Sequence, residues 1–177
     1  MAAFHKFALR LAVIALIAVQ GIAADAQISP PTNRSGSMVL NFRLDKDRLP
    51  VGQSPVAILI VDNLTDGYLK INDGGYRIHV DWKGGEAPTS MWQRCRKGAP
   101  HPGDTCPPVT ITLNVDVAGP WLIFSGMSDF RKIQLGYLYD LSAPGVYSVY
   151  AEVLDSSSQR WLRTQTIQFE IQAPIAQ

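Results

Sequence analysis

Three residues between positions 95 and 106 have side chains that could do chemistry. Cys95 and Cys106 are the two cysteines of the chain, and His101 lies between them. Two cysteines and one histidine are an incomplete ligand set for zinc, which normally takes four ligands. An even cysteine count in an exported chain favours a disulfide. Closing this 12-residue ring would lower the conformational entropy of the unfolded chain and so stabilise the folded chain by about 3 kcal/mol. We predict a Cys95–Cys106 disulfide that closes a surface loop, with no metal site and no cofactor.

The same loop carries the strongest interaction signal in the sequence. An apolar pair precedes three cations, and tryptophan and arginine are enriched at binding hot spots. Loops on a rigid β framework also carry a large share of binding residues. The candidate binding loop comprises Met91, Trp92, Arg94, Arg96, Lys97 and His101. The alternative is that Trp92 folds back over the end of the domain and that the cations are only solvated.

No constellation of residues predicts catalysis. The chain has no Gly-x-Ser-x-Gly elbow and no His-Glu-x-x-His motif. His79 stands between Arg77 and Asp81 on the outward side of an alternating strand, which predicts an exposed histidine. The segment 73–75, Asp-Gly-Gly, lacks the charge of a calcium loop and predicts a turn. We expect a protein that is not an enzyme.

Residues 1–26 have the features of a secretory signal peptide. Basic residues near the start precede an apolar run over 11–19, and the sequence Ala-Asp-Ala ending at Ala26 offers the small residues that signal peptidase recognises. The run is shorter than the roughly 20 apolar residues of a membrane-spanning helix. We predict cleavage after Ala26, with Ala23 and Ala24 as alternative sites.

The mature chain is expected to be electrically balanced. Loss of 26 of the 177 residues leaves 151, about the size of one domain. The loss removes two of 16 basic and one of 15 acidic residues, so 14 of each remain. This balance gives no electrostatic reason to expect nucleic acid or an anionic membrane as a partner. Residues 27–37, rich in Pro, Ser, Asn and Gly, predict a flexible tether before a domain over 38–173.

Apolar and polar residues alternate along most of the domain, which predicts β strands. The expected strands are Met38–Leu44, Val56–Val61, Tyr76–Trp82, Val109–Val115, Trp121–Phe124, Ile133–Tyr139, Val146–Leu154 and Trp161–Ile171. The second of these is continuously apolar, as in a strand covered on both faces. The predicted inward residues include Ile58, Ile78, Ile111, Val149 and Phe169, and the last strand is expected to face Thr164 outward.

A sharp corner is predicted at Pro144 and Gly145. Proline presets φ for a turn, and glycine accepts positive φ without steric cost. The strand that follows is apolar on both faces, so it is expected in the middle of a sheet. Three serines at 156–158 predict the turn of a hairpin between this strand and the last one.

Together these features predict an all-β fold, an antiparallel two-sheet immunoglobulin-like sandwich of seven to eight strands. No apolar period of 3.6 follows the leader. A closed barrel is the rival fold. The long run over 83–108 interrupts the even strand spacing of an up-and-down barrel and favours the sandwich.

The segment 141–149, Leu-Ser-Ala-Pro-Gly-Val-Tyr-Ser-Val, resembles the Leu-x-x-Pro-Gly-x-Tyr-x-Val corner near the end of bacterial secreted immunoglobulin-like modules. The segments Asp47–Gly52 and Val61–Asn63 are similar to the opening of the same modules. The strand order over Val39–Ile171 is also similar to that of BsuPI-type proteinase-inhibitor sandwiches. The resemblance implies the fold and, more distantly, an inhibitor, although those inhibitors are intracellular.

Two functions follow as expectations. The first is a non-catalytic exported module, periplasmic or extracellular, that binds or assembles with a protein or cell-envelope partner through its end loops. The second is a secreted protease inhibitor that presents the Cys95–Cys106 loop to an active site.

The leader generates the first testable prediction. Mass spectrometry of the exported protein should show a mature N-terminus near Gln27, because the apolar run is too short to remain as an anchor. A membrane-bound product that retains Met1 would contradict it.

Overall fold

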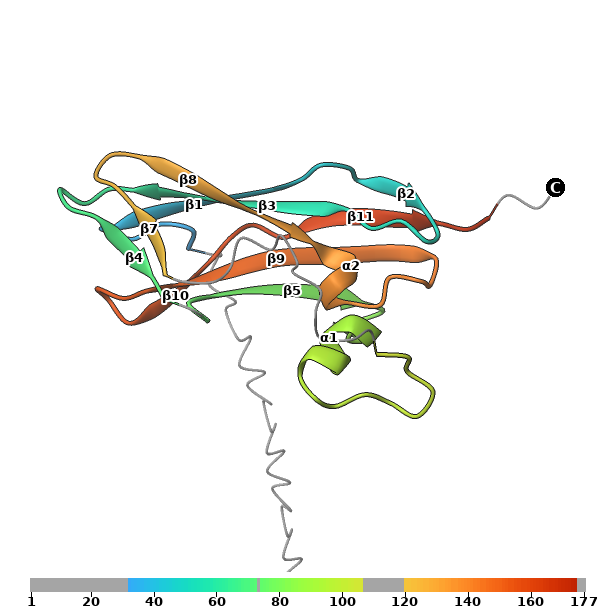
Figure 1. Ribbon diagram of the computed structural model, residues 1–177. Coiled ribbons are helices and arrows are strands. Elements are labelled where there is room, and N and C mark those ends of the chain that lie inside the picture. The colour runs from blue at the N-terminus through green and yellow to red at the C-terminus, as the bar shows by residue number, and fades with distance from the viewer. Residues whose placement is uncertain (1–31, 73, 107–119, 175–177) are drawn as a thin grey trace, which may run out of the picture.

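The computed structural model describes residues 32–72, 74–106 and 120–174, and β strands dominate these ranges (Figure 1). The strands are β1 (Met38–Leu44), β2 (Arg48–Pro50), β3 (Val56–Asn63), β4 (Leu69–Ile71), β5 (Tyr76–Trp82), β6 (Gly85–Glu86), β7 (Trp121–Ile123), β8 (Ser128–Gln134), β9 (Gly145–Asp155), β10 (Arg160–Arg163) and β11 (Ile167–Gln172). Two short helices, α1 (Met91–Arg96) and α2 (Leu135–Leu138), complete the described elements.

The strands form three sheets. One has the order β1-β3-β8, the largest has the order β2-β11-β9-β5-β6 with β10 also on β9, and β4 pairs with β7. In Figure 1, β1, β3 and β8 lie in a layer above β9, β5 and β10. Buried side chains of both layers form one hydrophobic core.

One strand pair departs from the expected antiparallel arrangement. β2 pairs with β11 in parallel, with Leu49 opposite Ile171. β2 follows β1 after a short connection that continues in the same direction (Figure 1), so the chain meets β11 without a reversal.

β9 is the central strand of the largest sheet. It pairs with β5 along one edge and with β10 and β11 along the other, which confirms its predicted position. Its inward residues are Tyr147, Val149, Ala151, Val153 and Asp155.

The predicted corner before β9 is also confirmed. Gly145 has a φ of +143°, and a Cβ there would stand 3.1 Å from Trp82 Nε1, so a larger residue is disfavoured on both grounds. Tyr147 donates its hydroxyl hydrogen bond to Ala143 O at 2.7 Å across the corner.

β3 lies between β1 and β8, but its second face is not covered as expected. Ala57, Leu59 and Val61 are fully buried, whereas the side chains that alternate with them are only partly buried. The prediction that Ile58 faces the core is therefore wrong. A continuous apolar run does not reveal which of its two faces is covered, because only the backbone register decides that.

The expected final strand is divided by a β-bulge. Thr164 N donates to Ala151 O at 2.9 Å, and Ala151 N donates to Thr164 Oγ1 at 3.0 Å, so a hydroxyl replaces one backbone acceptor. The bulge shifts the alternation by one residue between Leu162 and Ile167. Thr164 is consequently buried, contrary to the expectation that it faces outward.

The expected strand Ile133–Tyr139 is also wrong beyond Gln134. The chain instead enters α2, and Leu135 is fully buried. Leu135 N donates to Pro55 O at 3.1 Å, and Tyr139 is buried at the other end of the turn. A helical turn buries Leu135 and Tyr139 and leaves Tyr137 exposed, whereas an extended chain would turn all three side chains to the same face.

Part of the expected tether is attached to the domain. Asn33 O accepts a hydrogen bond from Leu40 N at 2.8 Å, and Arg34 forms a β-bridge with Val39. The expected strand Val109–Val115 and its core residue Ile111 lie outside the described residues. Among the residues that are described, no helix is long and apolar enough to cross a membrane.

The two faces of β9 generate a prediction from a matched pair of valines. Val149→Ala removes two methyl groups from a side chain that is 0% exposed, so the free energy of unfolding should fall by about 2 kcal/mol. Val146→Ala, at a side chain that is 56% exposed, should change it by about 0.5 kcal/mol or less. Urea denaturation measures both, and equal losses would contradict the assignment of faces.

Candidate functional site

The candidate binding loop begins with a capped helix. Ser90 is the N-cap of α1, and its Oγ accepts a hydrogen bond from Gln93 N at 3.0 Å. Arg94 and Arg96 stand in the last turn, where positive charge favours the helix dipole. The loop thus contains an ordered helical turn where the sequence had predicted only an irregular surface loop.

Ser90 also attaches α1 to α2. Its backbone N donates to Leu138 O at 3.0 Å, and its hydroxyl donates to Tyr137 O. Asp140 N donates to Pro88 O at 2.7 Å, which extends this attachment along the chain. α1 and α2 therefore lie side by side at one end of the molecule (Figure 1).

The side chain of Arg94 links the two ends of the loop by hydrogen bonds. Its Nε and Nη2 donate to the two carboxylate oxygens of Asp104 at 2.9 and 2.8 Å, and its Nη1 donates to Thr89 O. The Arg94 and Asp104 side chains are 17% and 11% exposed. Two parallel hydrogen bonds between a guanidinium and a carboxylate form the strongest common type of ion pair.

This ion pair sets the ionisation of both partners. The hydrogen bonds from Arg94, joined by one from His101 N at 2.8 Å, lower the pKa of Asp104 from 3.8 to about 2. The hydrogen bond to Asp104 raises the pKa of Arg94. The pair thus stays charged across the whole range in which the protein is expected to work.

The disulfide closes the same loop covalently. Cys95 and Cys106 are bonded, with their Cα atoms 5.6 Å apart, which confirms the sequence prediction. The bridge joins the last turn of α1 to the residue two positions after Asp104. The loop is therefore held by a covalent bond and by the ion pair within a few residues of each other.

A shallow open groove lies between α1 and α2. It has a volume of about 660 Å³, and its large apolar side chains are those of Met91, Trp92, Tyr137, Tyr139 and Leu141. Met91 and Tyr137 are each 42% exposed, and Trp92 is partly buried. The rings of Trp92 and Tyr137 lie 5.6 Å apart and are tilted at 45°. We call this feature the α1–α2 groove; its polar lining includes Ser54, Gln134 and Asp140.

The structure divides the candidate binding residues into two groups. Met91 and Trp92 line the groove, and the Arg96 guanidinium carbon lies 5.5 Å from the centre of the Trp92 ring. Lys97 and His101 are exposed on the disulfide loop. Arg94, by contrast, is committed to Asp104 and Thr89, so its charge is not free for a partner.

His79 lies on the outer face of β5 as expected, but it is not a plain exposed side chain. Its ring stacks on Tyr150 at 4.7 Å, and its Nε2 lies 3.1 Å from Glu152 Oε2. Arg163 covers the other side of Tyr150, at 3.5 Å from the ring centre. These contacts follow from the register of β5 on β9, in which His79 stands opposite Tyr150.

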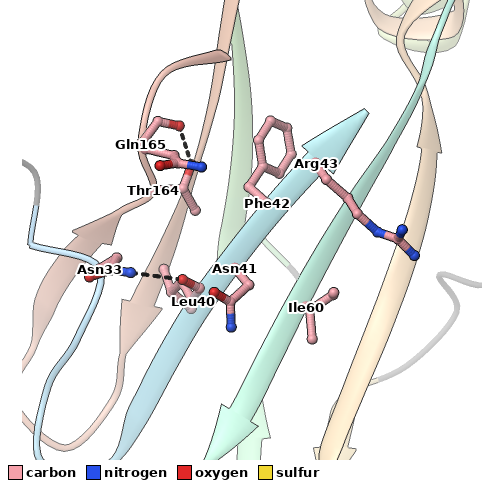
Figure 2. Close-up of a pocket in the computed structure, with 8 residues that line it drawn as sticks. All are labelled: Asn33, Leu40, Asn41, Phe42, Arg43, Ile60, Thr164 and Gln165. Atoms are coloured by element: carbon pink, nitrogen blue, oxygen red, sulfur yellow. Dashed lines mark hydrogen bonds between the residues drawn. The ribbon is translucent and has the colours of Figure 1, made fainter. Parts of the chain in front are cut away.

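A smaller pocket of about 160 Å³ lies between β1 and the connection from β10 to β11 (Figure 2). Asn33 donates to Leu40 O at 3.1 Å in its wall. Thr164 Oγ1 donates to Gln165 O at 3.1 Å and accepts from Ala151 N. These two polar groups bond to the framework, and Asn41, Arg43 and Gln165 supply the other polar side chains of the lining.

Nothing in the described part of the chain forms a metal-binding cluster of three or more His, Cys, Asp or Glu side chains.

One tyrosine has a strongly shifted pKa. Burial, followed by the nearby carboxylate of Glu86, raises the pKa of Tyr139 above its usual range. Its hydroxyl lies 2.8 Å from Ile78 O and 3.1 Å from Glu86 Oε1, so this group anchors α2 to β5.

Sequence reasoning missed Ser90, Asp104 and Tyr137. The first had a detectable signal, because Ser90 and Gln93 have the Ser-x-x-Gln spacing of a helix N-terminus. Asp104 is the one acidic residue between Met91 and Cys106, which made it the natural partner for a cation of the loop. Tyr137 had no signal, since its proximity to Trp92 depends on the tertiary fold.

Comparisons with known proteins show no family for this chain. No protein-family model matches the sequence, and no curated protein matches it. Among solved structures, the chain is similar to the Pseudomonas fluorescens alkylpurine DNA glycosylase AlkC bound to DNA containing an abasic site analog. That likeness has a TM-score of 0.44 at 10% identity, over 78% of this chain and 31% of the glycosylase chain. The chain thus spans about a third of the length of that enzyme, and the likeness carries no argument about function.

The ion pair generates a prediction about pH. Because the pKa of Asp104 lies below its ordinary value, the pair should stabilise the loop at every pH above about 4, and this contribution should decline as the pH falls toward about 2. A carbon-13 NMR titration of the carboxyl groups measures the midpoint. Asp104→Asn should also speed hydrogen exchange at His101 N, whereas Asp66→Asn at an exposed turn should not. A midpoint for Asp104 near 4 would contradict the pairing.

Proposed function

We propose that the chain is exported and that its mature part is a non-catalytic immunoglobulin-like module that binds another macromolecule through the α1–α2 groove. One observation carries this proposal. Met91, Trp92 and Tyr137 stay partly exposed although the disulfide, the ion pair and Ser90 hold the backbone beneath them in place. A surface that is ordered before binding loses less entropy when a partner is bound.

The immunoglobulin-like part of the proposal is supported by strand order and by the corner before β9. The orders β1-β3-β8 and β11-β9-β5 bring together strands in the pattern of the two sheets of that fold. Tyr147 bonds back to Ala143 O, in the manner of the tyrosine corner at the start of an equivalent strand.

Export is supported by the leader features of residues 1–26 and by the oxidised cysteines. Disulfides persist mainly in oxidising compartments such as the periplasm and the extracellular space. The bridge spans only 11 positions, so its largest effect is on the shape of one loop. A bridge that served mainly the stability of the domain would join distant strands, as in antibody domains.

The alternative function, a secreted protease inhibitor, has less support from the backbone. Proteases commonly hold an inhibitor as an extended strand, whereas this loop is helical over α1. Gly98 and Gly103 have φ of +69° and +94°, which turn the chain between the two cysteines. The disulfide loop is therefore helical in its first part and turns at both glycines.

The proposal predicts a difference between two similarly placed tryptophans. Trp92 and Trp161 are both partly buried, and each lies near an arginine. In a capture experiment with the native envelope fraction, Trp92→Ala should weaken binding of the recovered partner tenfold or more, on the order of 1.4 kcal/mol. Trp161→Ala, on the outer face of β10, should leave binding unchanged.

Three further measurements decide between the outcomes. Cys95→Ser with Cys106→Ser should preserve the fold but weaken binding to a similar extent. If Trp92→Ala lowers Tm by about 4 °C or more while binding holds, Trp92 serves the core and the proposal fails. Stoichiometric inhibition of an exported protease at nanomolar concentration would favour the inhibitor function.

A further inference from the structure

The free cations of the disulfide loop lie beside the α1–α2 groove, on its α1 side. Between Met91 and Cys106 the sequence holds three cations and one carboxylate, and Arg94 engages that carboxylate in two hydrogen bonds. Arg96 and Lys97 remain exposed, without a counter-charge inside the loop. In the lining of the groove, Asp140 is the one acidic residue; it is exposed, and its Oδ1 accepts a hydrogen bond from Ser142 N at 3.0 Å, so a negative charge remains on the α2 side of the groove.

One of these cations lies beside an apolar side chain of the groove, and the other follows it directly in the chain. The Arg96 guanidinium stands over the Trp92 ring, and Lys97 is the C-cap of the same helix. Because the ion pair and the disulfide hold α1, the backbone positions of Arg96 and Lys97 are held relative to that of Trp92. An apolar contact and an ionic contact would thus be made by the same few residues of a partner.

We propose that the partner of the α1–α2 groove is a protein segment with an apolar anchor side chain flanked by carboxylates. The anchor enters between Met91, Trp92 and Tyr137, and the carboxylates meet Arg96 and Lys97. This inference rests on the proposed binding function and adds the chemistry of the partner to it. Methionine adapts its shape to different apolar side chains, so the anchor is defined by its apolar character more than by its outline.

A set of defined peptides tests this inference. The probe is a blocked nine-residue peptide with a central leucine and two glutamates on each side. Two matched peptides carry lysines for the glutamates or serine for the leucine. Nitrogen-15 NMR titration of the full mature protein should show shifts at Met91, Trp92 and Tyr137 with the first peptide and none of comparable size with the other two.

Charge-neutralising variants provide a matched control. Arg96→Gln with Lys97→Gln should weaken binding of the acidic peptide about fivefold, as expected for two exposed charge pairs. Lys70→Gln with Arg160→Gln removes the same charge at exposed positions of β4 and β10, and should leave the affinity unchanged. Added salt should weaken the binding of the acidic peptide to the wild-type protein. It should have little effect on the binding of this peptide to the Arg96→Gln, Lys97→Gln variant.

Several outcomes would overturn the inference. These are equal binding of the glutamate and lysine peptides, equal losses in the two charge variants, or shifts at Trp92 with phosphatidylglycerol vesicles instead of peptide. Shifts at the same residues that depend on protein concentration alone would indicate a second copy and would also overturn it. If the acidic peptide fails while Trp92→Ala still abolishes capture of the envelope partner, this inference is wrong and the proposed function stands.

Discussion

The backbone hydrogen bonds of β9 are the constraint on which the rest of the structure depends. This strand has 11 residues, and it pairs with β5 on one edge and with β10 and β11 on the other. Because every second side chain is buried, a slip of one residue would carry Tyr147, Val149 and Ala151 to the solvent. The register of β9 therefore determines the positions of the strands on both of its sides.

The loop at the end of the molecule depends on this framework through a small number of contacts. Tyr139 anchors the end of α2 to β5, which is itself paired with β9. Ser90 then attaches α1 to α2. The position of Trp92 thus follows from a chain of hydrogen bonds that starts at the central sheet, whereas the shape of the loop around it follows from local closure by Cys95, Cys106 and Arg94.

Much of the fold could be predicted from the sequence because strand periodicity is a local property. β1, β5 and the face alternation of β9 follow directly from the spacing of their apolar residues. The bulge at Thr164 could not be predicted in this way, because one extra residue inverts the alternation without changing the composition. α1 and α2 have six and four residues, which is too short for a period of 3.6 to be visible.

The candidate site was predictable only in part, for a similar reason. The cysteines are visible in the sequence and correctly predicted the disulfide, and the density of cations around Trp92 made the same loop the candidate site. The sequence could not separate Arg94 from Arg96, because that distinction depends on which guanidinium reaches Asp104. It also presented Trp92 as either core or surface, whereas the side chain is partly buried against Tyr137.

The placement of α2 has a consequence for how ligands of this protein could be discovered. Tyr137 forms a wall of the groove, while Leu135 and Tyr139, two residues before and after it, are buried in the core. A molecule bound to Tyr137 would therefore stabilise α2, and the neighbours of Tyr137 in this turn belong to the hydrophobic core. Binding to the native state increases the free energy of unfolding by RT ln(1 + L/Kd), where L is the free ligand concentration, and so raises the unfolding temperature. A library of compounds could thus be screened by differential scanning fluorimetry before the biological partner has been identified.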